Sequence, residues 1–155
     1  MPAEAKVRKA KPEDAAVAAR LMYAFNTEFD EEIDEPEVLH RRYREQLEGG
    51  DVSVLLGGEG PDGFAQLRYR SQIYSDAPAA YLEELYVAPP KRGEGLGRAL
   101  LEAAMEEART RGADRIDLGT SEDDTAARGL YESAGFTNRE GKPDGPVMLY
   151  YERDL

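Results

Sequence analysis

A short stretch of glycines and basic residues, "KRGEGLGRALL" (91–101), has the composition of an anion-binding site. Three glycines occupy alternate positions, 93, 95 and 97, and an apolar helical pattern follows them. The first N–H groups of a helix have no intrahelical acceptor and lie at its positive end, where they favour phosphate groups. Glycines let such a backbone approach an anion closely, because no Cβ intervenes. The stretch therefore predicts a pyrophosphate-binding turn.

Two common phosphate-binding patterns do not fit this stretch. The P-loop pattern G-x-x-x-x-G-K-[ST] is absent, and the dinucleotide pattern G-x-G-x-x-G fails at its third glycine, where Arg98 stands. What remains is Arg92, Gly95 and Gly97 in the pattern R-x-x-G-x-G. The alternative interpretation is a tight turn that only joins a strand to a helix.

Two neighbouring carboxylates stand in the apolar segment "YLEELYV" (81–87), just before the glycine-rich stretch. Because strand side chains alternate, Glu83 and Glu84 are expected to point to opposite faces. A carboxylate in such a strand is costly unless it is solvated or paired. These acids are therefore either chemically active or bound to an arginine such as Arg68 or Arg70.

The surrounding pattern predicts a mixed α/β domain that would position these residues. The order of elements is β-α-α-β-β-β-α-β-α-β-β. The expected strands are 7–10, 52–56, 64–70, 81–87, 115–120, 136–139 and 147–155. The expected helices start after a cap at Asp14, after Pro36, at Leu96 and at 123, and they end before an acidic loop at 26–36, at Gly49-Gly50, at 111–112 and at 135.

Composition limits the function classes. The 155 residues fit a single domain, 1–155, and the formal net charge of −12 argues against nucleic-acid binding. Such acidity either attracts a cationic small molecule or only keeps the protein soluble. The chain has no cysteine, which excludes a thiol nucleophile and suits a cytoplasmic location. No clustered metal ligands, leader peptide or membrane span is expected.

Two motifs resemble those of the GNAT superfamily of acyl-CoA N-acyltransferases and occur in the same order as in that family. The resemblance implies the GNAT fold for the whole chain. The resemblance covers residues 81–137. The first motif comprises Val87, Pro89, Arg92, Gly93, Gly95, Gly97, Leu100 and Leu101. The second comprises Asp124, Ala127, Leu130, Tyr131, Glu132, Gly135 and Phe136, with Asp124 where the family usually has asparagine.

The resemblance implies acetyl-CoA as the acyl donor and assigns its binding groups. Backbone N–H groups from Arg92 to Arg98 would bind the pyrophosphate: those of Arg92, Gly93, Glu94, Gly95, Leu96, Gly97 and Arg98. Backbone groups of Leu85, Tyr86 and Val87 would hold the pantetheine arm and polarise the thioester carbonyl. Asp124 would contact the same arm or only cap its helix.

The resemblance also implies the catalytic roles. Tyr131 matches the family's general acid, and the alternative is a tyrosine that packs in the core. The strand resembles that of spermidine/spermine acetyltransferases, which makes Glu83 the expected base and Glu84 a substrate-side or structural acid. In the acidic loop, Glu28, Asp30, Glu31 and Glu32 would attract the acceptor amine, unless the loop is only a solvated one.

The expected reaction is the direct transfer of an acetyl group to a primary amine of a small molecule or peptide, without a metal. The alternative is a catalytically silent acyl-CoA sensor or interaction module. The final segment, 147–155, is expected to pair across a homodimer.

Overall fold

The computed structural model describes residues 6–155, and it divides the chain into two compact units. The first unit extends to Leu118, and the second comprises Gly119–Leu155. The prediction of a single domain therefore stays a prediction. Among residues 6–155, every helix is too short or too polar to cross a bilayer.

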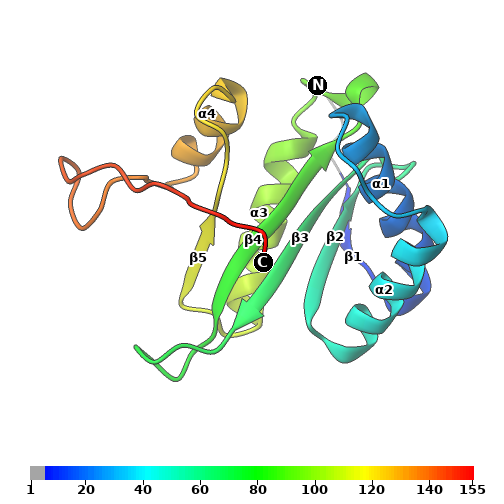
Figure 1. The fold of residues 1–155 in the computed structure, drawn as a ribbon, viewed down its shortest axis with the longest axis horizontal. Coiled ribbons are helices and arrows are strands. Elements are labelled where there is room, and N and C mark those ends of the chain that lie inside the picture. Colours follow the sequence, from blue (N-terminus) through cyan, green and yellow to red (C-terminus); the bar gives the residue numbers. More distant parts are fainter. Residues whose placement is uncertain (1–5) are drawn as a thin grey trace. The chain divides into compact units, whose positions relative to one another are not determined.

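The first unit is built on a five-stranded sheet with the order β1-β2-β3-β4-β5 (Figure 1). Neighbouring strands are antiparallel except β4 and β5, which are parallel. A parallel pair needs a crossover connection, and α3 supplies it. The strands are β1 (Val7–Lys9), β2 (Val52–Gly57), β3 (Gly63–Arg70), β4 (Ala79–Val87) and β5 (Arg115–Leu118).

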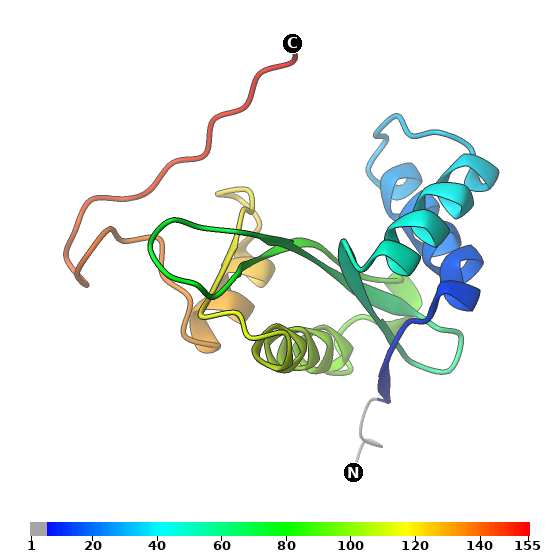
Figure 2. The same ribbon diagram turned by 90° about the horizontal axis from the view of Figure 1, so that it is seen from below.

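Helices cover both faces of this sheet (Figure 2). α1 (Ala15–Glu28) and α2 (Pro36–Gly49) lie on one face, and α3 (Leu96–Thr110) lies on the other. Successive side chains of β2 point alternately to the two faces of the sheet. Val52 and Val54 join the hydrophobic core formed with α1 and α2, whereas the buried Ser53 donates a hydrogen bond to Glu107 of α3 at 3.1 Å.

Both ends of α1 differ from the prediction. A 3₁₀ turn, Pro12–Asp14, precedes α1, and the Asp14 carboxylate makes no capping bond to it. Instead Asp14 accepts hydrogen bonds from Arg8 at 2.9 and 3.0 Å and from the Lys11 N–H at 2.8 Å, which lower its pKa. α1 also continues to Glu28, so the acidic loop is only 29–35. The predicted end of α2 is confirmed by Gly50, at φ 73°.

The second unit contains α4 (Thr125–Ser133), which confirms the predicted helix. The two closing strands predicted at 136–139 and 147–155 are wrong, because only an isolated pair, Arg139 with Val147, forms there among the described residues. The connection between them carries prolines at 143 and 146, and proline cannot donate to a ladder. The apolar side chains that follow it are largely exposed: Val147, Met148, Leu149, Tyr150 and Tyr151.

Candidate active site

The glycine-rich turn joins β4 to α3 through a 3₁₀ turn, Pro89–Lys91. Gly93 and Gly95 have φ angles of 82° and 87°, which side chains other than glycine's rarely allow. A Cβ at either position would meet no atom within 4 Å, so the glycines serve the backbone conformation and leave its surface open. The first bond within α3 is donated by Ala99 to the Gly95 carbonyl at 3.1 Å. The N–H groups of Leu96 and Gly97 therefore belong to the first turn, where no intrahelical acceptor is in reach.

The side chain of Arg92 folds back from this turn. Its Nε donates to the Val87 carbonyl at 2.9 Å, and its Nη2 lies 2.8 and 2.9 Å from the two carboxylate oxygens of Glu28. The guanidinium carbon also lies 5.8 Å from the centre of the Tyr86 ring, within the range of a cation–π contact. The structure thus brings together Glu28, Val87 and Arg92, which the sequence assigned to the acceptor, the pantetheine arm and the pyrophosphate.

Tyr86 fixes this group of residues to the core. Its ring stacks on Phe25 of α1 with 4.8 Å between centroids, and only 5% of the residue is exposed. Its hydroxyl donates to Glu28 Oε1 at 3.2 Å. Burial first, and then the Glu28 carboxylate, raises the pKa of Tyr86, so the phenol keeps its proton.

A β-bulge interrupts β4 at the two carboxylates. Gln66 pairs with Glu84 and the next residue of β3, Leu67, pairs with Leu82, so Glu83 is the extra residue. The bulge breaks the alternation on which the prediction of opposite faces for Glu83 and Glu84 depended. Both carboxylates act on Tyr43 of α2, whose pKa is raised by burial, then by Glu84 and then by Glu83. Bulges of this kind are common beside active sites, where they redirect a side chain.

Glu83 is held by an arginine, as the salt-bridge interpretation of the sequence predicted. Arg68 Nε donates to Glu83 Oε2 at 2.7 Å, and Arg68 Nη2 lies 3.5 Å from the other oxygen. The same Nη2 donates to Gln46 of α2 at 3.0 Å. Arg70, the other predicted partner, pairs with Asp117 of β5 instead, at 2.8 Å.

Glu84 lies in a different electrostatic environment. Its side chain is half-buried, and no hydrogen bond or ion pair of its carboxylate is found within residues 6–155. Burial, followed by the negative charge of Glu83, raises the pKa of Glu84 to about 7. A carboxylate with this pKa is partly ionised at neutral pH and is suited to accept a proton there.

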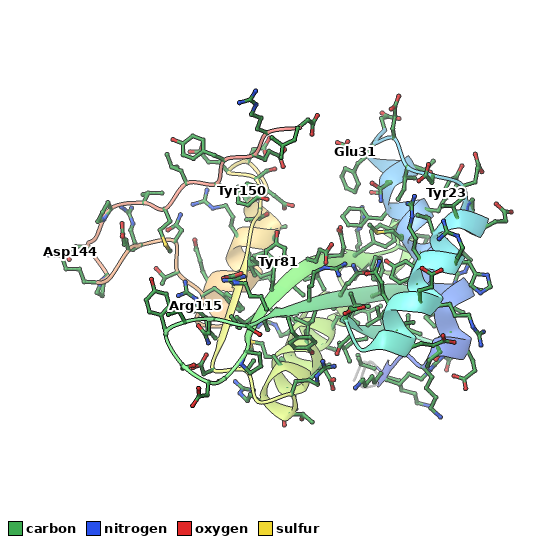
Figure 3. The ribbon with its side chains drawn as sticks, turned by 60° about the horizontal axis from the view of Figure 1, so that its bottom comes forward. Tyr23, Glu31, Tyr81, Arg115, Asp144 and Tyr150 are labelled. Atoms are coloured by element: carbon green, nitrogen blue, oxygen red, sulfur yellow. The ribbon has the colours of Figure 1, made fainter. Side chains whose placement is uncertain are left out.

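The acidic loop extends from Phe29 to Glu35, and Figure 3 labels Glu31 within it. Glu28 belongs to the last turn of α1. Asp30 is exposed and has a positive φ of 54°. Ile33 packs against the core and anchors the loop. Of the acids predicted to attract the acceptor, Glu28 is therefore fixed by hydrogen bonds, whereas Asp30, Glu31 and Glu32 are exposed.

The remaining predicted residues, Asp124 and Tyr131, lie in the second unit on α4. The Asp124 carboxylate accepts a hydrogen bond from the Ala127 N–H at 3.1 Å, so it caps the helix. Tyr131 is half-buried, and its ring lies edge-on to Phe136 at 6.0 Å. Burial, and then Asp124, raises the pKa of Tyr131, so its phenol stays protonated as a general acid requires.

Tyr43 and Gln46 of α2 connect this helix to the bulge, and neither was among the residues predicted for the site. The Tyr43 hydroxyl donates to the buried Gln66 at 2.6 Å. The signal that could have revealed the bulge is the pair of adjacent acids itself. A regular strand packed on both faces would bury one of two neighbouring carboxylates on each face, and a bulge avoids this cost.

The fold and these motifs define a class of enzyme. Residues 18–136 match the model of the acetyltransferase (GNAT) family, which is more than half of the chain. The chain therefore belongs to the GNAT family of acetyltransferases, and it is an acyltransferase. Acetyl-CoA is the donor that this family uses.

Several known proteins of similar sequence or structure are described as acetyltransferases. The chain is 29% identical to aminoglycoside N(6')-acetyltransferase type 1 of Stenotrophomonas maltophilia, over 86% of this chain and 87% of that protein. It is 40% identical to mycothiol acetyltransferase of Beutenbergia cavernae over 70 residues, which cover 43% of this chain and only 24% of that protein. A crystal structure of a protein from Arthrobacter sp. FB24, described as a candidate acetyltransferase, is 43% identical and matches with a TM-score of 0.89, over 97% of this chain and 96% of that one.

Proposed function

We propose that this enzyme transfers the acetyl group of acetyl-CoA to a primary amine of a cationic small molecule, by direct attack within a ternary complex. The observation that carries the proposal is the pair of carboxylates at the β4 bulge. The strand that bears them leads directly into the glycine-rich turn. A proton acceptor and an anion-binding turn are thus built into one continuous segment.

The turn has the features that a pyrophosphate requires. Its exposed backbone at Gly93 and Gly95 has room on the side where other residues carry a Cβ, and α3 begins immediately after it. The positive end of a helix dipole and its first N–H groups stabilise phosphate oxygens. The pantetheine arm would then follow β4, where Leu85, Tyr86 and Val87 offer backbone groups.

The transfer needs one proton acceptor and one proton donor. The nitrogen lone pair of the amine attacks the thioester carbon, the C–S bond breaks, and the amine loses a proton while the thiolate gains one. We assign the first proton to Glu84 and the second to Tyr131. Glu83, which the sequence favoured as the base, serves instead as the ion-paired neighbour that keeps the Glu84 carboxylate basic.

Charge and relatives both favour a cationic acceptor. The chain has 32 acidic and 20 basic residues, and an acidic surface raises the local concentration of cations. The relative from Stenotrophomonas maltophilia is named for aminoglycosides, which are polyamines, and it is similar over most of both chains. The half-buried acids at the bulge would attract a small polyamine-like acceptor more strongly than a neutral one, because the polyamine is positively charged.

A screen for CoA release tests this proposal. The enzyme would be mixed with acetyl-CoA and with polyamines, aminoglycosides, amino acids or short peptides, and the free thiol would be measured. We expect turnover with polycationic amines and an acetylated product in the mass spectrum. Binding of acetyl-CoA without turnover on any amine would favour the sensor over the enzyme of this proposal. Turnover confined to peptides would contradict the proposed acceptor class.

A further inference from the structure

We propose that Glu28 exchanges its cationic partner during the reaction: it holds Arg92 in the free enzyme and an ammonium group of the acceptor once the coenzyme's pyrophosphate has drawn Arg92 away. The inference rests on the proposed function. It makes Glu28 a binding residue for the acceptor that becomes available only after the coenzyme has bound.

The first step of the argument is that Arg92 occupies groups that the coenzyme needs. Its Nε bonds the Val87 carbonyl at 2.9 Å, and this carbonyl belongs to the segment expected to hold the pantetheine arm. Its Nη2 bonds the Glu28 carboxylate at 2.8 Å. The cation next to the anion-binding turn is therefore already bound to an anion of the protein, and the coenzyme must compete for it.

The second step is that the coenzyme can win this competition. The side chains of Arg92 and Glu28 are 44% and 25% exposed, and ion pairs of such exposure are weak because water screens them. A pyrophosphate carries more negative charge than one carboxylate and would also receive the backbone N–H groups of the turn. The exposure of the Arg92 side chain leaves it room to change direction.

The third step is that Glu28 needs a cation after Arg92 has left. Glu28 is the last residue of α1, where the helix dipole is negative and disfavours a carboxylate. Tyr86 would still donate its hydrogen bond at 3.2 Å, but it brings no charge. The exposed acids that follow, Asp30 and Glu31, add to the negative potential. An ammonium group of a polycationic acceptor would replace the guanidinium in this position.

The exchange predicts an order of binding. The coenzyme would bind first and would strengthen acceptor binding, because it removes the competing cation from Glu28. By thermodynamic linkage the acceptor would strengthen coenzyme binding by the same factor. Glu28 and Arg92 would thus couple the two substrate sites.

Glu28→Gln tests the exchange, with Glu45→Gln as the matched control. Glu45 pairs with Arg41 on the surface of α2 at 3.6 Å, so its variant makes the same charge change and also removes an arginine partner. We would measure CoA binding by calorimetry without acceptor, pantetheine binding as the ligand without pyrophosphate, and the acceptor KM at saturating acetyl-CoA.

In Glu28→Gln we expect CoA to bind about threefold to tenfold more tightly, pantetheine to gain less than CoA because it offers Arg92 no pyrophosphate, and the acceptor KM to rise about tenfold. Glu45→Gln should stay within about twofold of wild type in all three. Weaker CoA binding in Glu28→Gln, or an unchanged acceptor KM, would overturn the exchange, because the ion pair would then only stiffen the turn. Wild-type protein that binds no CoA would instead overturn the proposed function, and the exchange with it.

Discussion

Arg68 Nε lies 2.7 Å from Oε2 of Glu83, and this contact makes two neighbouring carboxylates chemically different. Glu83 is held in an ion pair by this arginine. No such partner of Glu84 is found within residues 6–155, and burial, followed by the negative charge of Glu83, raises the pKa of Glu84 to about 7. One strand therefore presents an ion-paired carboxylate next to a carboxyl group whose pKa is close to neutral pH. This difference between Glu83 and Glu84 depends on the bulge in β4, which the sequence alone does not reveal.

The first prediction concerns the pH dependence of the reaction. Since the base must be ionised, we expect kcat/KM to rise with pH on an acidic limb with an apparent pKa near 7. Glu84→Gln should lower kcat by about 100-fold or more and remove this limb. Glu83→Gln should keep the acidic limb but move it to lower pH, because burial still raises the pKa of Glu84 while the added effect of the Glu83 charge is gone. The reverse pattern, with the limb lost only in Glu83→Gln, would make Glu83 the base.

The second prediction concerns stability. The pKa of Glu84 is raised in the folded protein, from 4.5 to about 7, so the folded state binds the proton more tightly than the unfolded state does. The stability from the neutral carboxyl is complete below pH 4.5 and is lost as the pH rises through about 7. Glu84→Gln should therefore raise the free energy of unfolding by about 1–3 kcal/mol at pH 8 and by little at pH 4.5. Urea unfolding at the two pH values measures this, and an equal effect at both would contradict it.

The sequence predicted most of the first unit because local signals decide it. Prolines, glycines and apolar periodicity set the ends of α2 and α3 and the positions of the strands. The family motifs placed the glycine-rich turn correctly. What the sequence could not give is the geometry between side chains. Whether Glu83 meets Arg68 or Arg70 depends on the register of β3 against β4, which the bulge shifts by one residue.

The end of the chain shows the opposite case. The segment from Val147 to Tyr151 is rich in β-branched and aromatic residues, and its propensity predicts a strand. A strand also needs a partner with free backbone groups, and propensity does not supply one. Only the pair Arg139 and Val147 forms within the second unit, so the segment remains exposed. The homodimer predicted from this segment remains a proposal, and light scattering of the purified protein tests it.

The third prediction tests how Arg68 controls the acid pair. Arg68→Met would remove the cation that pairs with Glu83 and lies beside the bulge. The loss of a nearby positive charge disfavours ionisation of Glu84, so the acidic limb of kcat/KM should move to higher pH. The control is Arg70→Met, which removes the exposed pair with Asp117 in the same strand. An identical shift in both variants would show that only the net charge matters.

The fourth prediction concerns the backbone of the glycine-rich turn. Gly95 has a φ of 87°, and a Cβ there meets no atom, so Gly95→Ala is strained by its backbone alone. We expect it to lower the free energy of unfolding by about 1–2 kcal/mol and to weaken CoA binding. Gly129→Ala, inside α4 and also in open space, should instead raise helix stability by up to about 1 kcal/mol. Calorimetry with CoA and thermal unfolding check both. Unchanged CoA affinity in Gly95→Ala would argue that the turn does not hold the pyrophosphate.

The fifth prediction separates catalysis from packing at Tyr131. The ring contacts Phe136 and is half-buried, so Tyr131→Phe keeps the packing and removes only the hydroxyl. If this hydroxyl protonates the departing thiolate, kcat should fall by about 100-fold while the affinity for CoA and the melting temperature stay close to wild type. Because the pKa of Tyr131 is raised, wild-type activity should show no loss from phenol ionisation up to pH 9. Tyr74→Phe, at an almost fully exposed tyrosine, is the control for removing a phenol. A variant with wild-type kcat would leave Tyr131 only its packing role, and the thiolate would then leave without an acid from the protein.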